Sequence, residues 1–202
     1  MTDIASQYRI TAEGAGWAVK TGRGRLRFDG RDRLTFLQAL VSNDVESLDE
    51  GRGVYAVYLT PQGRMLADMR LYHRGDYLLA DVPAGETAAL AARLDGLIFT
   101  EDVRVVDVST TLRQLTVVGT TADAVIARAL SIDAERVRAL PVLSQLPVPG
   151  GFIARTDDAD RPSFDVFIDS GSDAGGEAQM VQGLETAGAV AISPDVVEVL
   201  RI

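Results

Sequence analysis

The chain has 202 residues, of which 47% are hydrophobic and 24% are charged, and it carries a formal net charge of −9. This length suits one large globular domain or two small, intertwined ones. The acidic residues are scattered, and a negative surface repels phosphate backbones, so we expect no nucleic-acid partner. The sequence has no run of about 18 apolar residues and no signal-like N-terminus, which favours a cytoplasmic protein with no membrane span.

Cysteine is absent, and His73 is the one histidine. Disulfides, thiolate nucleophiles and cysteine-held iron–sulfur clusters are therefore excluded within the chain. No GxSxG motif accompanies His73, and a metal site built mainly on histidines needs more than one of them. We assign no catalytic residue and no metal ligand.

Strand and helix patterns are mixed along the chain, which favours a fold with both kinds of element. Strands are expected over 24–28, 54–60, 64–72, 77–81, 103–108, 113–119, 151–157 and 164–169. Helices are expected within 29–45, over 86–95, 120–130 and 176–189, and in a last element from Ser193 onward. The segment 29–45 has apolar residues at helical spacing and should form about three turns.

The hairpin over 54–72 holds one unexpected residue. The turn "TPQG" at 60–63 joins two strands, and Asp68 lies in the middle of the second. Alternation places Asp68 on one face with Leu66, Arg70 and Tyr72, and Ala67 on the other face with Met65, Met69 and Leu71. Asp68 is either a solvated strand residue paired with Arg70 or a residue retained for binding, because aspartate is disfavoured in strands.

Three stretches around this hairpin resemble a folate-binding family. They are "FLQALVSNDV", "GRGVYAVYLTPQGRMLADMRLY" and "DYLLADV". The family includes the glycine-cleavage T-protein, an aminomethyltransferase, and the YgfZ-type proteins. The matching features are the Asn43-Asp44 pair, Tyr55 and the hairpin from Gly63 to Asp68. Weaker matches follow in the same order: "VVGTTADAV", "FDVFI" with Asp165, and "VVEVLRI" with Arg201.

One departure from the family pattern favours the YgfZ-type branch. T-proteins carry an Asp-Asp pair in the hairpin, whereas the first position here is Ala67. The YgfZ signature KGCYxGQE needs a cysteine and is absent. The chain stops in a short helical pattern without a C-cap, so we expect the natural chain to continue past Ile202. The alternative is a terminal helix docked by Val196, Val197 and Leu200.

The resemblance implies an α+β, aminomethyltransferase-like folate-binding fold without its C-terminal barrel. Its two lobes would be intertwined. Residues 1–47 plus 139–202 would form the first lobe, and residues 48–138 the second, which contains the β meander.

The resemblance also implies a site for tetrahydrofolate or a one-carbon derivative. Asp68 would lie near the reactive nitrogens, Tyr55 would stack on or hydrogen-bond the ligand, and Asp165 would bond the pterin edge. Arg201 would pair with a carboxylate, and Asp81 is a weaker candidate. Without a ligand, Tyr55 would be a core tyrosine and Asp165 a solvated carboxylate at a strand end.

Three functions follow from this resemblance. The main one is a YgfZ-type accessory protein that binds tetrahydrofolate and supports iron–sulfur cluster assembly or repair in client enzymes. The alternative is a tetrahydrofolate-dependent aminomethyltransferase or other one-carbon transferase, in which case the chain would be an enzyme. A degenerate, non-binding interaction domain is the third.

Overall fold

The computed structural model describes residues 4–169 and 175–200, and the chain divides into two compact units. Residues 1–20 and 111–202 form one unit, and residues 21–110 form the other. The sequence placed the junctions after residues 47 and 138 instead. The difference follows from pairing, because the strand at 23–29 joins the meander and the strand at 112–118 joins the other sheet.

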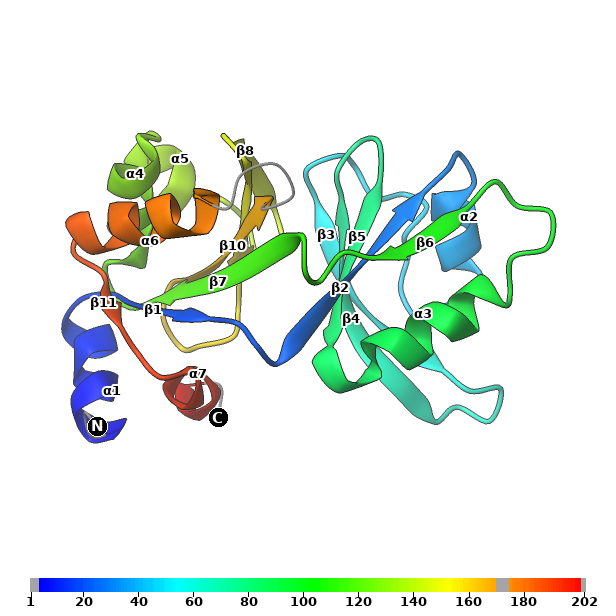
Figure 1. Ribbon diagram of the computed structural model, residues 1–202, viewed down its shortest axis with the longest axis horizontal. Coiled ribbons are helices and arrows are strands. Elements are labelled where there is room, and N and C mark those ends of the chain that lie inside the picture. The colour runs from blue at the N-terminus through cyan, green and yellow to red at the C-terminus, as the bar shows by residue number, and fades with distance from the viewer. Residues whose placement is uncertain (1–3, 170–174, 201–202) are drawn as a thin grey trace. The chain divides into compact units, whose positions relative to one another are not determined.

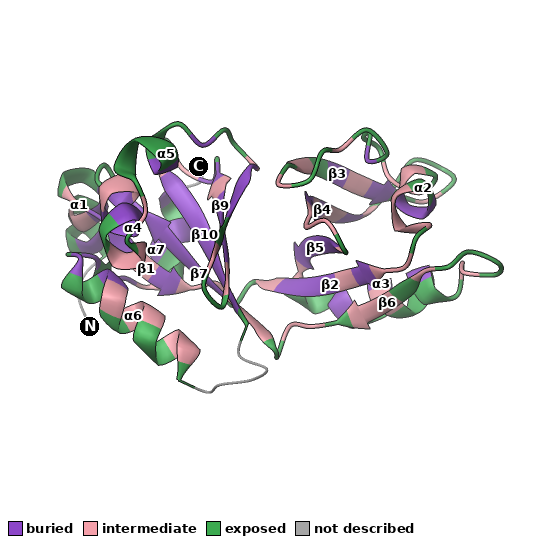
Figure 2. Ribbon diagram, turned by 90° about the horizontal axis from the view of Figure 1, so that it is seen from above, coloured by how far each residue is buried: buried purple, intermediate pink, exposed green. Residues whose placement is uncertain are grey.

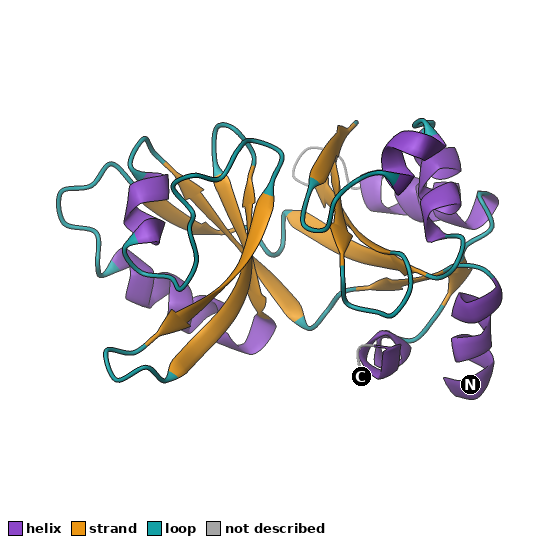
Figure 3. Cartoon of the chain, turned by 180° about the vertical axis from the view of Figure 1, so that it is seen from behind, coloured by secondary structure: helices purple, strands orange, loops and turns teal. Residues whose placement is uncertain are grey.

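The 21–110 unit is a five-stranded antiparallel sheet with helices on one face (Figures 1 and 3). The strand order is β3-β4-β5-β2-β6. The strands are β2 (Arg23–Asp29), β3 (Gly53–Leu59), β4 (Met65–His73), β5 (Leu78–Pro83) and β6 (Arg104–Asp107). The helices are α2 (Arg33–Gln38) and α3 (Thr87–Asp95), and a 3-10 turn, η1 (Ala84–Glu86), precedes α3. Apolar residues of both helices pack with those of β2 to β5 in one core.

The hairpin between β3 and β4 forms as expected. The Gly63 amide donates to the Thr60 carbonyl at 2.8 Å, and Gly63 has φ +80°, a conformation that favours glycine. Ala67, Met69 and Leu71 are buried in the core, as the alternation predicts. Met65 differs, since it is 64% exposed. The pairing shifts by one residue between Tyr58 and Leu59, and this bulge lies next to Met65.

The expected helix within 29–45 is shorter than predicted, because α2 ends at Gln38. The following residues instead cover the edge of β3. Ser42 Oγ accepts from the Val57 amide at 3.0 Å, and Asn43 Nδ2 donates to the Tyr55 carbonyl at 3.0 Å. Sheet edges with unpaired backbone groups are prone to pair with other chains, so these side chains protect the edge.

The other unit is a six-stranded sheet in the order β11-β1-β7-β10-β9-β8. Its strands are β1 (Gly16–Val19), β7 (Leu112–Val118), β8 (Gln145–Val148), β9 (Gly151–Thr156), β10 (Ser163–Asp169) and β11 (Val190–Ala191). Its helices are α1 (Ile4–Glu13), α4 (Ala122–Leu130), α5 (Ala134–Arg138), α6 (Gly176–Thr186) and α7 (Pro194–Leu200). The β1–β11 pair is parallel, and the other pairs are antiparallel. The fold is therefore mixed α+β, as expected.

The core of this unit lies between the sheet and α4, α5 and α6, and its central strands are buried (Figure 2). The helix α7 packs elsewhere, with Val196, Val197 and Leu200 in a cluster with Ala18 and Val118. Arg201, a predicted site residue, lies outside the described residues. Within the described residues, every helix is too short or too polar to cross a bilayer.

Candidate functional site

The face of the five-stranded sheet opposite α2 and α3 carries a row of polar side chains. Tyr55 of β3 pairs with Arg70 of β4, Arg70 pairs with Asp81 of β5, and Asp81 pairs with Arg25 of β2. Directly paired residues in a sheet point to the same side. We call this side the charged face.

The guanidinium of Arg23, at the start of β2, joins two carboxylates of the charged face. Its Nε lies 2.7 Å from Asp81 Oδ1, and its Nη2 donates to the Asp81 carbonyl at 2.7 Å. Its Nη1 donates to Asp68 Oδ2 at 3.0 Å. Arg70 Nη1 lies 3.8 Å from Asp81 Oδ2 on the other side of that carboxylate. The cluster therefore links β2, β4 and β5 through charge-assisted hydrogen bonds.

The three candidate residues on this face differ in exposure. Asp81 is 0% exposed and the Asp68 side chain is 24% exposed. Tyr55 is 48% exposed, so it is not a core tyrosine. Asp68 and Tyr55 are thus the residues that a ligand on this face could reach, while Asp81 holds Arg23.

Arg23 is the functional candidate that the sequence reasoning missed, since Arg70 was the expected partner of Asp68. Burial lowers the pKa of the Arg23 guanidinium, but the charges and hydrogen bonds of Asp81, and then of Asp68, outweigh burial and raise that pKa. The signal lay in the alternation of "RGRLR", which places Arg23, Arg25 and Arg27 on one face of β2.

Ala67 points away from the charged face. It is 4% exposed and lies among the apolar residues of the core beneath α2 and α3. A second aspartate at this position would be buried without a partner, at a large cost. Alanine at this position therefore satisfies the packing of this chain.

A second carboxylate cluster lies in the unit formed by residues 1–20 and 111–202. Lys20 Nζ contacts both oxygens of Asp165, at 3.0 and 2.8 Å, and Asp158 Oδ2 at 2.8 Å. Gln114 Nε2 also donates to Asp165 Oδ2, at 3.0 Å. Asp165 lies in the middle of β10 and is fully buried, so it is not a solvated carboxylate at a strand end.

Comparison with protein-family models matches residues 2–144 to the GCVT N-terminal domain. The match covers well over half of the chain. The chain belongs to this family.

Curated relatives of this GCVT-family chain are aminomethyltransferases. The one from Bacillus mycoides (strain KBAB4) is 27% identical over 176 residues, which are 84% of this chain and 47% of that protein. The one from Geobacillus kaustophilus (strain HTA426) is 29% identical over 170 residues, which are 82% of this chain and 46% of that protein. The chain thus spans about half the length of the curated relatives it matches.

Solved structures show the same fold for this GCVT-family chain. The glycine cleavage system aminomethyltransferase T from Bartonella henselae matches with a TM-score of 0.83 and 19% identity, over 98% of this chain and 53% of that one. A chain of the heterotetrameric sarcosine oxidase from Corynebacterium sp. U-96 matches with a TM-score of 0.59 and 15% identity, over 94% of this chain and 95% of that one.

The structure of this GCVT-family chain brings three of the predicted site residues onto one face. These are Asp68, Asp81 and Tyr55 of the 21–110 unit. Asp165 belongs to the other unit, where Lys20 and Gln114 engage it. Asp68 and Asp165 therefore belong to two separate clusters, one in each compact unit.

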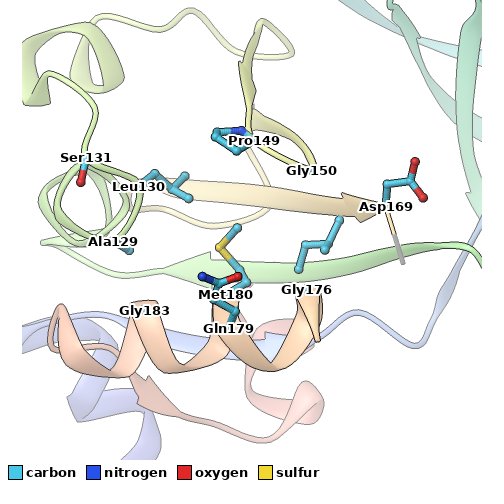
Figure 4. A pocket seen from close by; sticks show the side chains of 11 residues that line it. Ala129, Leu130, Ser131, Pro149, Gly150, Asp169, Gly176, Gln179, Met180 and Gly183 are labelled. Carbon is cyan, nitrogen blue, oxygen red and sulfur yellow. The ribbon is translucent and has the colours of Figure 1, made fainter. Parts of the chain in front are cut away.

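The second unit also contains a pocket of about 410 Å³ between the end of α4 and α6 (Figure 4). Leu130 and Met180 contribute its apolar lining, and Asp169 and Gln179 are among its polar residues. Both polar residues are exposed. Among the described lining residues, no buried polar group directs a ligand, so this part of the pocket lacks the features of a specific site.

Proposed function

We propose that the chain binds tetrahydrofolate, or a one-carbon derivative of it, and takes part in aminomethyl or related one-carbon transfer. The proposal rests on the position and exposure of Asp68. This residue is an accessible carboxylate on the hairpin of a GCVT-family chain, on the same face as an exposed tyrosine. A ligand site needs a few placed polar groups beside a surface that covers the flat rings, and the charged face offers both.

Asp68 would accept a hydrogen bond from a nitrogen of the reduced pterin, and its charge would stabilise positive charge that develops during transfer of a one-carbon unit. Tyr55 would cover part of the ring system. Asp81 has a supporting role in this proposal, since it is fully buried and engaged by Arg23.

Transfer chemistry is favoured over an accessory role in iron–sulfur cluster assembly. The matched relatives are aminomethyltransferases. The accessory role rests on the sequence resemblance alone. Because the chain spans about half of these relatives, we propose ligand binding for the chain itself and transfer for the whole protein.

A second candidate is a domain that works within a larger assembly. The matched chain of the heterotetrameric sarcosine oxidase is covered over 95% of its length, so a chain of this extent exists in a multi-subunit enzyme. This candidate also accommodates the third function predicted from the sequence, an interaction domain that binds no folate.

Calorimetric titration with tetrahydrofolate under reducing conditions tests the proposal. We expect saturable binding, and we expect Asp68→Asn to weaken it about 10- to 100-fold, because a hydrogen bond to a charged group is lost. The matched control is Asp95→Asn, on the exposed side of α3, which should bind like the wild type.

The absence of binding at millimolar ligand, with an intact fold, would reject the proposal and favour the interaction domain. A second assay, for methylene-tetrahydrofolate formed from an aminomethyl donor, separates transfer from binding alone. Product from the chain would assign catalysis to it, and binding without product would limit the chain to binding.

A further inference from the structure

The guanidinium of Arg23 contacts both Asp68 and Asp81, but the two carboxylates differ in burial and in how many of their oxygens are engaged. Asp81 is fully buried, with Oδ1 bonded to Arg23 and Oδ2 near Arg70. Asp68 is partly exposed, and Arg23 engages only its Oδ2. Among the described residues, Asp68 Oδ1 has no hydrogen-bond partner.

Arg23 is well suited to hold Asp68 in one orientation. Its side chain is largely buried, and three of its nitrogens are engaged at once, two by Asp81 and one by Asp68. The planar guanidinium fixes the directions of these bonds relative to one another. The main chain of Arg23 is itself held, because Arg25 Nη1 donates to its carbonyl at 2.8 Å.

We propose that Arg23 is a positioning residue for ligand binding at Asp68. It occupies Oδ2 and fixes the carboxylate so that Oδ1 is presented as a single acceptor for an N–H group of the ligand. This inference rests on the proposed function for the identity of the ligand, a reduced pterin. The fixed orientation of Asp68 is a property of the free chain and does not depend on the ligand.

The orientation predicts a selective ligand interaction. A carboxylate with both oxygens free could form a bidentate pair with an amidine-like edge that donates two parallel N–H groups. Arg23 takes one acceptor site of Oδ2 and fixes the direction of that bond, so Oδ1 is the oxygen left fully open to a ligand. A group that donates one N–H, such as a ring nitrogen, therefore fits this acceptor better than a two-donor edge.

The first experiment needs no ligand. We expect the three-bond couplings between Hα and the two Hβ protons of Asp68 to report one staggered rotamer in the wild type, and rotamer averaging in Arg23→Met. Unchanged couplings in Arg23→Met, with the fold intact by circular dichroism, would overturn the inference while leaving the proposed function standing.

The second experiment is a double-mutant cycle in tetrahydrofolate affinity, with Arg23→Met, Asp68→Asn and the double variant. We expect Arg23→Met to weaken binding about 10-fold in the wild-type background and less than about 2-fold in the Asp68→Asn background. An equal loss in both backgrounds, or no loss, would overturn the inference. A wild type that binds no tetrahydrofolate would overturn the proposed function, and the couplings would still test the orientation of Asp68.

Arg23→Lys is the companion variant if Arg23→Met does not fold. Lysine keeps the charge and can bridge two carboxylates, as Lys20 does, but its single nitrogen cannot reproduce the three bonds that the planar guanidinium of Arg23 makes. We expect it to retain stability and still show averaged Asp68 couplings and weaker binding. Wild-type couplings and affinity in Arg23→Lys would show that charge alone suffices, which would contradict the positioning role.

Discussion

Each of the two units contains carboxylates held by one cationic side chain, but the two clusters differ in how many carboxylate oxygens are hydrogen-bonded. In the unit of residues 1–20 and 111–202, Lys20 engages both oxygens of Asp165 and one of Asp158, and Gln114 adds a further bond. In the 21–110 unit, Arg23 engages Asp81 through two groups and Asp68 through one oxygen only. Both oxygens of Asp165 are thus engaged, whereas Oδ1 of Asp68 has no hydrogen-bond partner among the described residues.

This difference separates a structural role from a binding role. A ligand at Asp165 would have to share or displace bonds that already satisfy a buried charge, which is costly. A ligand at Asp68 would add a bond to Oδ1, which none of the residues that the structure describes engages. The resemblance pointed to both aspartates, and for the proposed ligand site the geometry favours Asp68 over Asp165.

The largest expected effect is that of Lys20→Met. It leaves two buried carboxylates without their cation, so we expect the free energy of unfolding to fall by about 3–5 kcal/mol. Urea unfolding followed by fluorescence of Trp17, the one tryptophan, reports this unit, because Trp17 lies in β1.

Arg138→Met is the control for this variant, since it removes an exposed cation from Asp123 and Glu135, and such pairs contribute little. If Lys20→Met lowered the free energy of unfolding no more than Arg138→Met does, the Lys20 cluster would not be a stabilising element of this unit.

A smaller expected effect tests the account of Ala67. Ala67→Asp would bury a charge among apolar side chains. We expect the free energy of unfolding to fall by about 3 kcal/mol, a figure that allows for some local rearrangement of the hairpin. Met65→Asp in the same strand is the matched control and should cost little, because Met65 is exposed. Urea unfolding followed by circular dichroism compares the two. Equal stabilities would show that position 67 tolerates an acid.

The smallest expected effect concerns an exposed carboxylate outside both clusters. The Ser47 hydroxyl, and then the Ser47 amide, hold the pKa of Asp44 below its usual value. Because the folded-state pKa is lowered, this interaction stabilises the fold above the ordinary carboxyl pKa and is lost as the pH falls through the lowered one. Ser47→Ala should raise the pKa of Asp44 toward its usual value in an NMR titration, and the pKa of Asp160, which Arg161 lowers, should not move. An unchanged Asp44 pKa would contradict the assignment.

Much of the fold could be predicted from local patterns. The meander, the 60–63 turn, α3, α4 and the two faces of β4 follow from periodicity and turn chemistry. The junctions between the compact units differ from the expected lobe boundaries because strand pairing is non-local: β2 inserts between β5 and β6, far from both in sequence. The elements β1, α5, β8 and β11 have too few residues for a clear period. The helix α1 has ten residues, but the residues it buries are the polar Gln7 and Thr11, so it shows no apolar stripe.

The sequence indicated only part of the Asp68 cluster, because its members come from strands that are far apart in sequence. Asp68 stood out locally, because an aspartate is unusual in a strand. Its partner Arg23 lies 45 positions away in sequence, and only the β4-β5-β2 arrangement brings the two together. The hydrogen bonds from Lys20 to Asp165 join residues 145 positions apart in sequence, and no local pattern reveals such a contact.

Carboxyl-carbon NMR of aspartate-labelled protein during titration with tetrahydrofolate tests the central claim most directly, because it observes both carboxylates in one sample. The account predicts that the Asp68 resonance shifts with saturation and that the Asp165 resonance stays in place. A shift of Asp165 with a stationary Asp68 would contradict it, as would two stationary resonances at saturating ligand.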